Sequence, residues 1–439
     1  MSPKISSSDE FKQRANKVVP HQTGTFSRSA SHFVEGVYPS YIESANGSHF
    51  TDVDGNEFID YLCGLGPITL GYNYKSVNDA IIQQLKKGIL FSLPHRIEVE
   101  ASELFCQTIP YADKVKFEKT GSNAVTGAVR AARAITNRDI IVYCGGGGVW
   151  HDWQAAMVSR DRGVPKFNAE LIKIFEYNDV EGLEQIFEDY PNKIAAIVME
   201  PTSFVKPKKE FLQKVRKIAD SNGALLILDE VITGFRFDLQ GGQKFFNVKG
   251  DLTCFGKGMG NGLPISAISG PDEFMNIFDE LWVSSTNNSE SLSLAGTVAV
   301  INEMKEKDTI SKCWKIGEKI FNGWNKITKE NNLNSIISGY PVRMDMQCFD
   351  SKNNSSPVLK ALILQEMVKN GIFISPSWIA VSYSHTNEDI QKTLDILDGV
   401  CKKIQNQVKN ENFSELLEGK MPTIVWSMKI PPTRKNHAR

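Results

Sequence analysis

The alternation of helical patterns with short, continuous apolar runs between about residues 100 and 300 limits the fold of this chain more than any other feature. Three of the runs cover residues 140–143, 194–199 and 224–228. Such runs are typical of strands buried on both faces, and their spacing leaves room for crossover helices. An apolar stripe from Phe211 predicts one such helix, which ends at an Asn-Gly pair directly before the third run. The pattern predicts an α/β domain with a mainly parallel sheet.

Composition excludes several classes of partner. The 439 residues are 41% apolar and carry 50 basic against 51 acidic side chains, for a net charge of -1. This balance provides no overall attraction to nucleic acid or to an anionic membrane. No run of about 18 apolar residues predicts a membrane span, and the polar N-terminus lacks the apolar centre of a secretory signal. We therefore expect a cytoplasmic protein that binds neither membrane nor nucleic acid.

The seven cysteines are widely spread and form no CxxC pair. An odd, scattered set indicates neither a disulfide framework nor a zinc ribbon. We expect free thiols in a reducing compartment and no bound metal.

The remaining patterns predict how the chain is divided. A hairpin is predicted at 48–60 around an Asp-Gly turn, and an amphipathic helix at 76–88. The apolar face of that helix consists of Val77, Ala80, Ile81 and Leu85. We expect an N-terminal arm and hairpin over 1–60, a large domain over 61–305, a small domain over 306–406, and a polar tail over 407–439. The tail contains one apolar patch, residues 424–426.

Two carboxylates follow predicted buried strands. Glu200 comes directly after the run 194–199, and Asp229 directly after the run 224–228. Ligands of open α/β sheets bind beyond the carboxyl ends of the strands. A carboxylate buried there must be paired or functional. A structural salt bridge is the alternative interpretation for each.

Lys257 lies among four alternate glycines in the segment GKGMGNG at 256–262. Neither the Walker phosphate loop nor the dinucleotide fingerprint fits this spacing. A lysine amine in a glycine-lined pocket suits a Schiff-base lysine. The alternative is a solvated lysine in a turn.

Two further elements point to a ligand. Gly121 and Ser122 open a helix of small residues, and a helix N-terminus with such residues can bind phosphate. Alternatively, Ser122 is an ordinary helix cap. Trp150 follows the run 140–143 and a glycine tract at 145–148, where an aromatic side chain can cover a flat ring. The alternative is a core aromatic under a loop.

In this order, the phosphate site, the aromatic, the strand-end aspartate and the lysine resemble the class III aminotransferases. The resemblance covers about residues 35–400 and is strongest at LILDEVITGFR, residues 226–236. The segments DLTCFGKGMGNGLP at 251–264 and DVDG at 52–55 also match, as does the separation of 28 residues between Asp229 and Lys257. The resemblance implies an aspartate-aminotransferase-like large domain and a smaller α+β domain from the N- and C-terminal segments.

The resemblance also implies pyridoxal 5'-phosphate (PLP) as cofactor and a role for each matching residue. Lys257 would form the Schiff base and move the proton, while Asp229 would pair with the ring nitrogen. The remaining roles fall on Val231 and Trp150 against the two ring faces, Gly121 and Ser122 at the phosphate, Glu200 near the ring hydroxyl, and Thr286 at the phosphate of a neighbouring subunit. An obligate homodimer follows from the last role.

Three positions depart from the family pattern. Asn123 stands where an acidic residue is usual, and residues 287–289 read Asn-Asn-Ser instead of Phe-Gly-Gly. Trp150-His151 can be aligned with the family's Tyr-His. Alternatively, the segment WHDW at 150–153 matches a later Trp-Gln-Asp-Trp, and the stacking aromatic is then missing.

The branch that the chain resembles most includes glutamate-1-semialdehyde aminomutase. The aminomutase stretch PGGVNSPVR, with its substrate-binding arginine, is replaced by FVEGVYPSY at 33–41. Segments at 65–72, 290–295 and 381–386 resemble aminotransferases of surface-sugar pathways instead. We expect transfer of an amino group from L-glutamate to the carbonyl of a sugar or similar polyhydroxy substrate. The alternatives are the aminomutase and a non-catalytic PLP-binding module.

Overall fold

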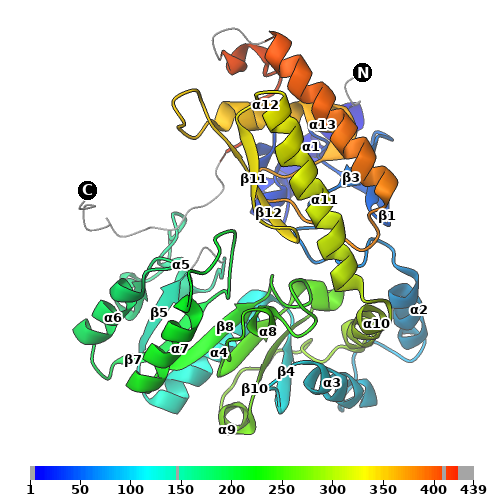
Figure 1. The fold of residues 1–439 in the computed structure, drawn as a ribbon. Helices are drawn as coiled ribbons and strands as arrows, with labels where there is room; N and C mark the ends of the chain where they lie inside the picture. Colours follow the sequence, from blue (N-terminus) through cyan, green and yellow to red (C-terminus); the bar gives the residue numbers. More distant parts are fainter. Residues whose placement is uncertain (1–4, 145–147, 408–411, 424–439) are drawn as a thin grey trace. The chain divides into compact units, whose positions relative to one another are not determined.

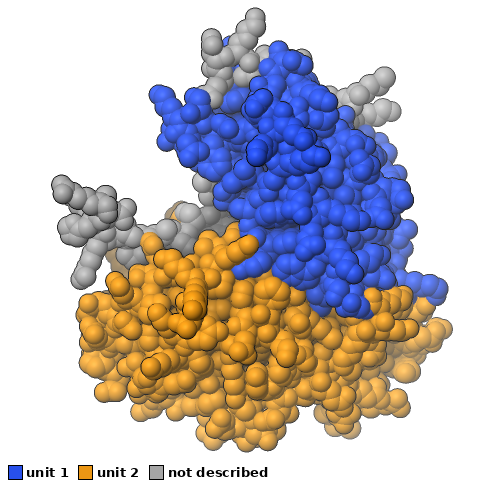
Figure 2. Space-filling view, in the orientation of Figure 1, with its two compact units in different colours: residues 1–75, 308–425 blue, residues 76–307, 426–439 orange. Residues whose placement is uncertain are grey.

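The computed structural model describes residues 5–144, 148–407 and 412–423. These residues form two compact units, which Figure 2 colours separately. The larger unit consists of residues 76–307. The smaller unit combines an N-terminal segment that ends at Lys75 with a C-terminal segment that begins at Asp308.

The larger unit is built on a seven-stranded sheet with the order β4-β10-β9-β8-β7-β5-β6. Its strands are β4 (Lys114–Glu118), β5 (Ile140–Cys144), β6 (Ile172–Ile174), β7 (Ile194–Met199), β8 (Leu225–Glu230), β9 (Leu252–Phe255) and β10 (Ser266–Gly270). Only β10 runs antiparallel to its neighbours. The α/β fold with a large, mainly parallel sheet is therefore confirmed. The carboxyl ends of the other six strands meet at one edge, where ligands of such sheets bind.

Helices cover both faces of this sheet (Figure 1). Alternate residues of β5 enter two separate cores, with Ile141 and Tyr143 in one and Val142 in the other. The first core contains α4, and the second contains α6 and α7. The helices of the unit include α3 (Arg96–Thr108), α4 (Gly121–Thr136), α5 (Asp152–Ala155), α6 (Val180–Asp189), α7 (Phe211–Asn222), α8 (Gly242–Phe245), α9 (Asp272–Met275) and α10 (Ser291–Lys307). Burial on both faces explains the continuous apolar runs of β5, β7 and β8.

The smaller unit joins segments that are far apart in the sequence. Its first sheet contains β1 (Ile42–Asn46), β2 (His49–Asp52), β3 (Glu57–Asp60) and β13 (Ile372–Phe373). Strands β2 and β3 form the predicted hairpin, and β13 pairs with β3 in parallel. The second sheet contains β11 (Ser335–Tyr340) and β12 (Arg343–Cys348). The main helices are α1 (Ser6–Val18), α11 (Thr309–Glu330), α12 (Pro357–Lys369) and α13 (Asn387–Gln407).

One predicted apolar face is only partly buried in this chain. The helix α2 (Lys75–Leu85) is present, but of its four predicted apolar residues Val77 is buried while Leu85 is 51% exposed. The exposed apolar surface continues at Leu90 and Leu93. Periodicity predicted the helix, but it did not show which of its residues are buried.

Two predicted features lie outside the described residues, namely most of the glycine tract at 145–148 and the apolar patch at 424–426. Among the helices that the structure describes, none has the length and apolarity to span a membrane.

Candidate active site

Asp229 occupies the carboxyl end of β8, in the middle of the sheet. Its side chain is 8% exposed, and its Oδ1 accepts a hydrogen bond from the Val231 amide at 3.0 Å. The strand register places Asp229 opposite Cys254 of β9. Asp229 therefore holds a nearly dry carboxylate at the edge where the parallel strands end.

Lys257 follows β9, the strand next to β8, after a single glycine. The register pairs Phe255 with Glu230, so Lys257 and Asp229 come from the ends of adjacent strands. Lys257 has a φ of 40°, in the left-handed region that costs energy for a residue with a side chain. It begins a short 3₁₀ turn, residues 257–260, whose other three residues are buried. The Lys257 side chain itself is half-buried.

The N-terminus of α4 lies at the same edge. Thr120 is its N-cap, because the Thr120 Oγ1 accepts a hydrogen bond from the Asn123 amide at 3.2 Å. The alternative that Ser122 caps this helix is wrong, since Ser122 stands two positions later. The first two amides, of Gly121 and Ser122, have no partner within a helix. Together with the Ser122 hydroxyl they form a set of donors suited to an anion.

Val231 joins these elements. A Cβ on Gly121 would lie 2.8 Å from two Val231 methyl carbons, and one on Gly256 would lie 3.4 Å from Val231. The start of α4 and the segment before Lys257 therefore both pack against the residue that follows Glu230. Ser266 of β10 adds a hydrogen bond to the Thr120 carbonyl at 2.7 Å. Sequence reasoning missed Ser266, because its position gains meaning only from strand pairing.

Glu200 lies one residue beyond β7 and is also buried. The next residue, Pro201, would be 3.2 Å from a Cβ on Gly242 at the start of α8. The ends of β7, β8 and β9 thus bring Glu200, Asp229 and Lys257 to one edge of the sheet.

The two tryptophans after β5 have different environments. Trp153 is buried in the core and donates to the Thr126 hydroxyl at 2.8 Å. His151 Nδ1 contacts the same hydroxyl at 2.6 Å, and burial lowers the pKa of His151. Trp150 is 73% exposed and meets the His151 ring edge-on, with 4.4 Å between centroids. Trp153 is therefore a core aromatic, which was the alternative interpretation of this segment, whereas Trp150 is not.

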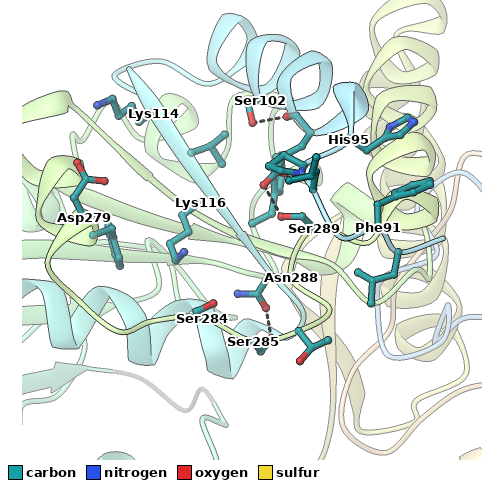
Figure 3. Close-up of a pocket in the computed structure, with 18 of the residues that line it drawn as sticks. Phe91, His95, Ser102, Lys114, Lys116, Asp279, Ser284, Ser285, Asn288 and Ser289 are labelled. Carbon is teal, nitrogen blue, oxygen red and sulfur yellow. Dashed lines mark hydrogen bonds between the residues drawn. The ribbon is translucent and has the colours of Figure 1, made fainter. Parts of the chain in front are cut away.

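Thr286 is exposed on a loop that precedes α10. Side-chain hydrogen bonds hold this loop, from Ser285 to Asn288 and from Ser289 to Glu98. Glu290 pairs with Lys119 at 2.9 Å, which ties the loop to the residue before Thr120. The loop borders a pocket of about 520 Å³, together with Lys116 of β4 (Figure 3).

The other walls of this pocket include exposed apolar residues. Leu90, Phe91 and Leu93 line it and are 46%, 40% and 79% exposed. Figure 3 shows Phe91 and His95 on one side and the serines of the Thr286 loop on another. The surface around Thr286 is thus partly apolar and open.

Comparison with known proteins identifies the family. The model of the family described as "Aminotransferase class-III" matches residues 32–400. The chain belongs to the class III aminotransferase family. It is 32% identical over 419 residues to the glutamate-1-semialdehyde 2,1-aminomutase of Alkaliphilus oremlandii, covering 90% of this chain and 98% of that protein. Family membership makes this chain a PLP-dependent enzyme, as the sequence motifs predicted.

Solved structures agree on the fold. The FumI protein of a Sphingopyxis species has a TM-score of 0.87 at 23% identity, covering 95% of this chain and 99% of that one. A glutamate-1-semialdehyde aminomutase from Pseudomonas aeruginosa has a TM-score of 0.78 at 17% identity, covering 90% and 94%. This class III fold places the candidate residues of the larger unit on a known scaffold.

The residues of this class III chain fit PLP. The absent Cβ of Gly121 leaves the start of α4 in contact with Val231, so the phosphate donors lie next to the residue expected against the ring. Asp229 is a buried carboxylate suited to a protonated ring nitrogen, and Lys257 adds an amine on the neighbouring strand. The helix amides, the buried carboxylate and the amine are thus of the types that suit the phosphate, the ring nitrogen and the aldehyde of PLP.

Proposed function

We propose that this enzyme binds PLP at the strand-end site of the larger unit and uses Lys257 as its catalytic lysine. When bound, the cofactor supplies an electron sink that labilises the bonds at the amino-bearing carbon. The observation that supports this role best is the adjacent placement of Asp229 and Lys257 at the ends of paired strands.

Each residue contributes a distinct step. Asp229 would keep the ring nitrogen protonated, because a nearly dry anion favours the charged form of its partner. Lys257 would hold the cofactor through Nζ and carry a proton between carbon atoms. Gly121 and Ser122 would bind the phosphate, Val231 and Trp150 would cover the ring, and Glu200 would lie near its hydroxyl.

The proposed reaction is a 2,1-aminomutase reaction on glutamate-1-semialdehyde. The sequence segments favoured a sugar aminotransferase, but relatives that are 31–32% identical over most of this chain carry the aminomutase name. This reaction moves the amino group from carbon 2 to carbon 1 of one molecule and needs no second substrate.

Amino transfer to a sugar is the second candidate. It is supported by FVEGVYPSY at 33–41 in place of the aminomutase stretch. One experiment separates the two. An aminomutase converts glutamate-1-semialdehyde to 5-amino-4-oxopentanoate with no added donor. A sugar aminotransferase instead consumes L-glutamate in a 1:1 ratio with its amino-sugar product and leaves the semialdehyde unchanged.

We also infer a homodimer in which a second copy covers the surface around Thr286. Leu93 and Trp282 are 79% and 84% exposed in the larger unit, and exposed apolar patches of this kind mark interaction sites. Closed two-fold dimers are the commonest assembly. Leu93→Asp should raise the dimer dissociation constant about 10- to 100-fold, the range of an interface hot spot. Val205→Asp, at another exposed apolar residue, should leave it unchanged.

A further inference from the structure

Glu230, the last residue of β8, is a completely buried carboxylate that the proposed chemistry does not use. It accepts three hydrogen bonds from the connection that follows the strand. The Thr233 hydroxyl donates at 2.5 Å, the Gly242 amide at 2.7 Å and the Gln243 amide at 2.6 Å. One carboxylate therefore holds both ends of the segment 233–243.

Glycine contacts show how tightly this segment is packed. A Cβ on Gly241 would lie 2.9 Å from the Glu230 carboxyl carbon. A Cβ on Gly234 would lie 2.8 Å from the Glu230 carbonyl oxygen and 2.4 Å from the Phe255 ring. Because Phe255 ends β9 and Gly242 contacts Pro201 after β7, the segment lies against three strand ends. Displacement of the segment would disturb all three.

Glu230 is also linked to Asp229 through the backbone. The two residues are consecutive in a strand, so their side chains point to opposite faces of the sheet. Residue 231 connects both, since its amide donates to Asp229 Oδ1 and its backbone leads through residue 232 into the segment 233–243 that Glu230 holds. The position of that amide therefore depends on the Glu230 hydrogen bonds.

We propose that Glu230 is a positioning residue for the reaction, which fixes the Asp229 carboxylate by binding segment 233–243 to the end of β8. This inference rests on the proposed role of Asp229 at the ring nitrogen. All three partners are donors, so the ionised carboxylate matches them best. Burial raises the pKa of Glu230 to about 7, and the negative charge of Asp229 adds to that rise. Its protonation near neutral pH should therefore weaken the positioning.

The test compares Glu230→Gln with Glu184→Gln, a control at an exposed glutamate of α6. A glutamine has a single acceptor oxygen, and its amide nitrogen would face one of the donors that the second carboxylate oxygen now accepts from. Glu230→Gln should lower kcat at least tenfold while KM changes less than threefold. The midpoint of the pH titration of the bound cofactor, followed by its absorbance, should also shift by about half a pH unit or more. The control should match the wild type in each measurement.

Thr233→Val provides a second variant if Glu230→Gln does not fold. It removes one of the three donors and keeps the shape of the side chain, so it should shift the cofactor absorbance in the same direction by a smaller amount. Thr233→Ser keeps the hydroxyl and should restore the wild-type behaviour. A structural role alone would lower the melting temperature without changing the cofactor absorbance.

Asp229→Asn separates failure of this inference from failure of the proposed function. If Asp229→Asn itself has nearly normal turnover, the proposed function is wrong. If it is strongly impaired, the combined Asp229→Asn and Glu230→Gln variant should be no slower than Asp229→Asn alone, because residues that act through one another are not additive. Additive losses, or normal kcat and absorbance in Glu230→Gln and Thr233→Val, would overturn the inference.

Discussion

The strand-end site and the Thr286 loop lie in the same unit but are built differently. Asp229 is buried, and the start of α4 packs against Val231 so closely that Gly121 has no room for a side chain. The Thr286 loop is exposed, and hydrogen bonds from Ser285 to Asn288 and from Ser289 to Glu98 of α3 hold it beside an open pocket. The first region is closely packed, whereas the second is an exposed surface.

Each of the two regions meets a different requirement of the proposed chemistry. Proton transfer and charge stabilisation need fixed groups in a dry environment, which a sheet edge with packed backbone supplies. A group that completes the phosphate site of another subunit must instead remain exposed until assembly. The ion pair of Lys119 with Glu290 connects the two regions, because Lys119 directly precedes the N-cap of α4.

Loss of the catalytic amine should have the largest effect. Lys257→Ala should reduce turnover about 10³-fold or more, since it removes both the covalent anchor and the proton carrier. Lys244→Ala, at an exposed lysine of α8, is the control. Circular dichroism should show the same fold for both variants. Borohydride reduction of the wild type followed by peptide mapping should place the cofactor on Lys257, and a different modified lysine would refute the assignment.

Asp229→Asn should have the second-largest effect. It should lower kcat about 10²- to 10³-fold, which is comparable to removal of one preorganised electrostatic group. An asparagine keeps the size of the side chain but removes the charge that holds the proton on the ring nitrogen. Cofactor retention, measured by dialysis and absorbance, should fall much less than kcat. Asp189→Asn on α6 serves as control, and equal losses of affinity and kcat would indicate a binding role only.

Gly121→Ala tests how closely the strand-end site is packed. The new Cβ would overlap Val231, and overpacking of this kind costs about 1–3 kcal/mol. We expect cofactor affinity to fall about tenfold or more by fluorescence titration, with partial recovery in the Gly121→Ala, Val231→Ala double variant. Gly399→Ala is the control, because nothing lies within 4 Å of its Cβ. Wild-type affinity in Gly121→Ala would show that the start of α4 can move.

Thr286→Ala should have the smallest effect. Loss of one hydroxyl that binds phosphate should weaken cofactor affinity about tenfold, the cost of one hydrogen bond to a charged group. Ser284→Ala in the same loop should not weaken it. If the hydroxyl acts across an interface, dilution should release cofactor and activity together. A fully active monomer in light scattering would contradict the difference drawn between the two regions.

The sequence predicted well what depends on local pattern. The runs at 194–199 and 224–228 became β7 and β8, and the helix from Phe211 ends at Gly223 with a positive φ of 60°. Strands with weak apolar signals were not predicted. One example is β10, residues 266–270, whose five residues include two serines and a glycine. Its burial comes from pairing with β4 and β9, which no local pattern reveals.

The amino-acid sequence by itself determined the family, the parallel sheet and the spacing of Asp229 and Lys257. Buried strands and strand-end motifs can be recognised from residues that are adjacent in the sequence. Only the tertiary structure decided that Thr120 rather than Ser122 caps α4, and that Glu230 binds the segment 233–243. These outcomes depend on which donors and acceptors meet when the chain folds. Hydrogen bonds between residues far apart in sequence follow from packing, and packing is a property of the whole unit.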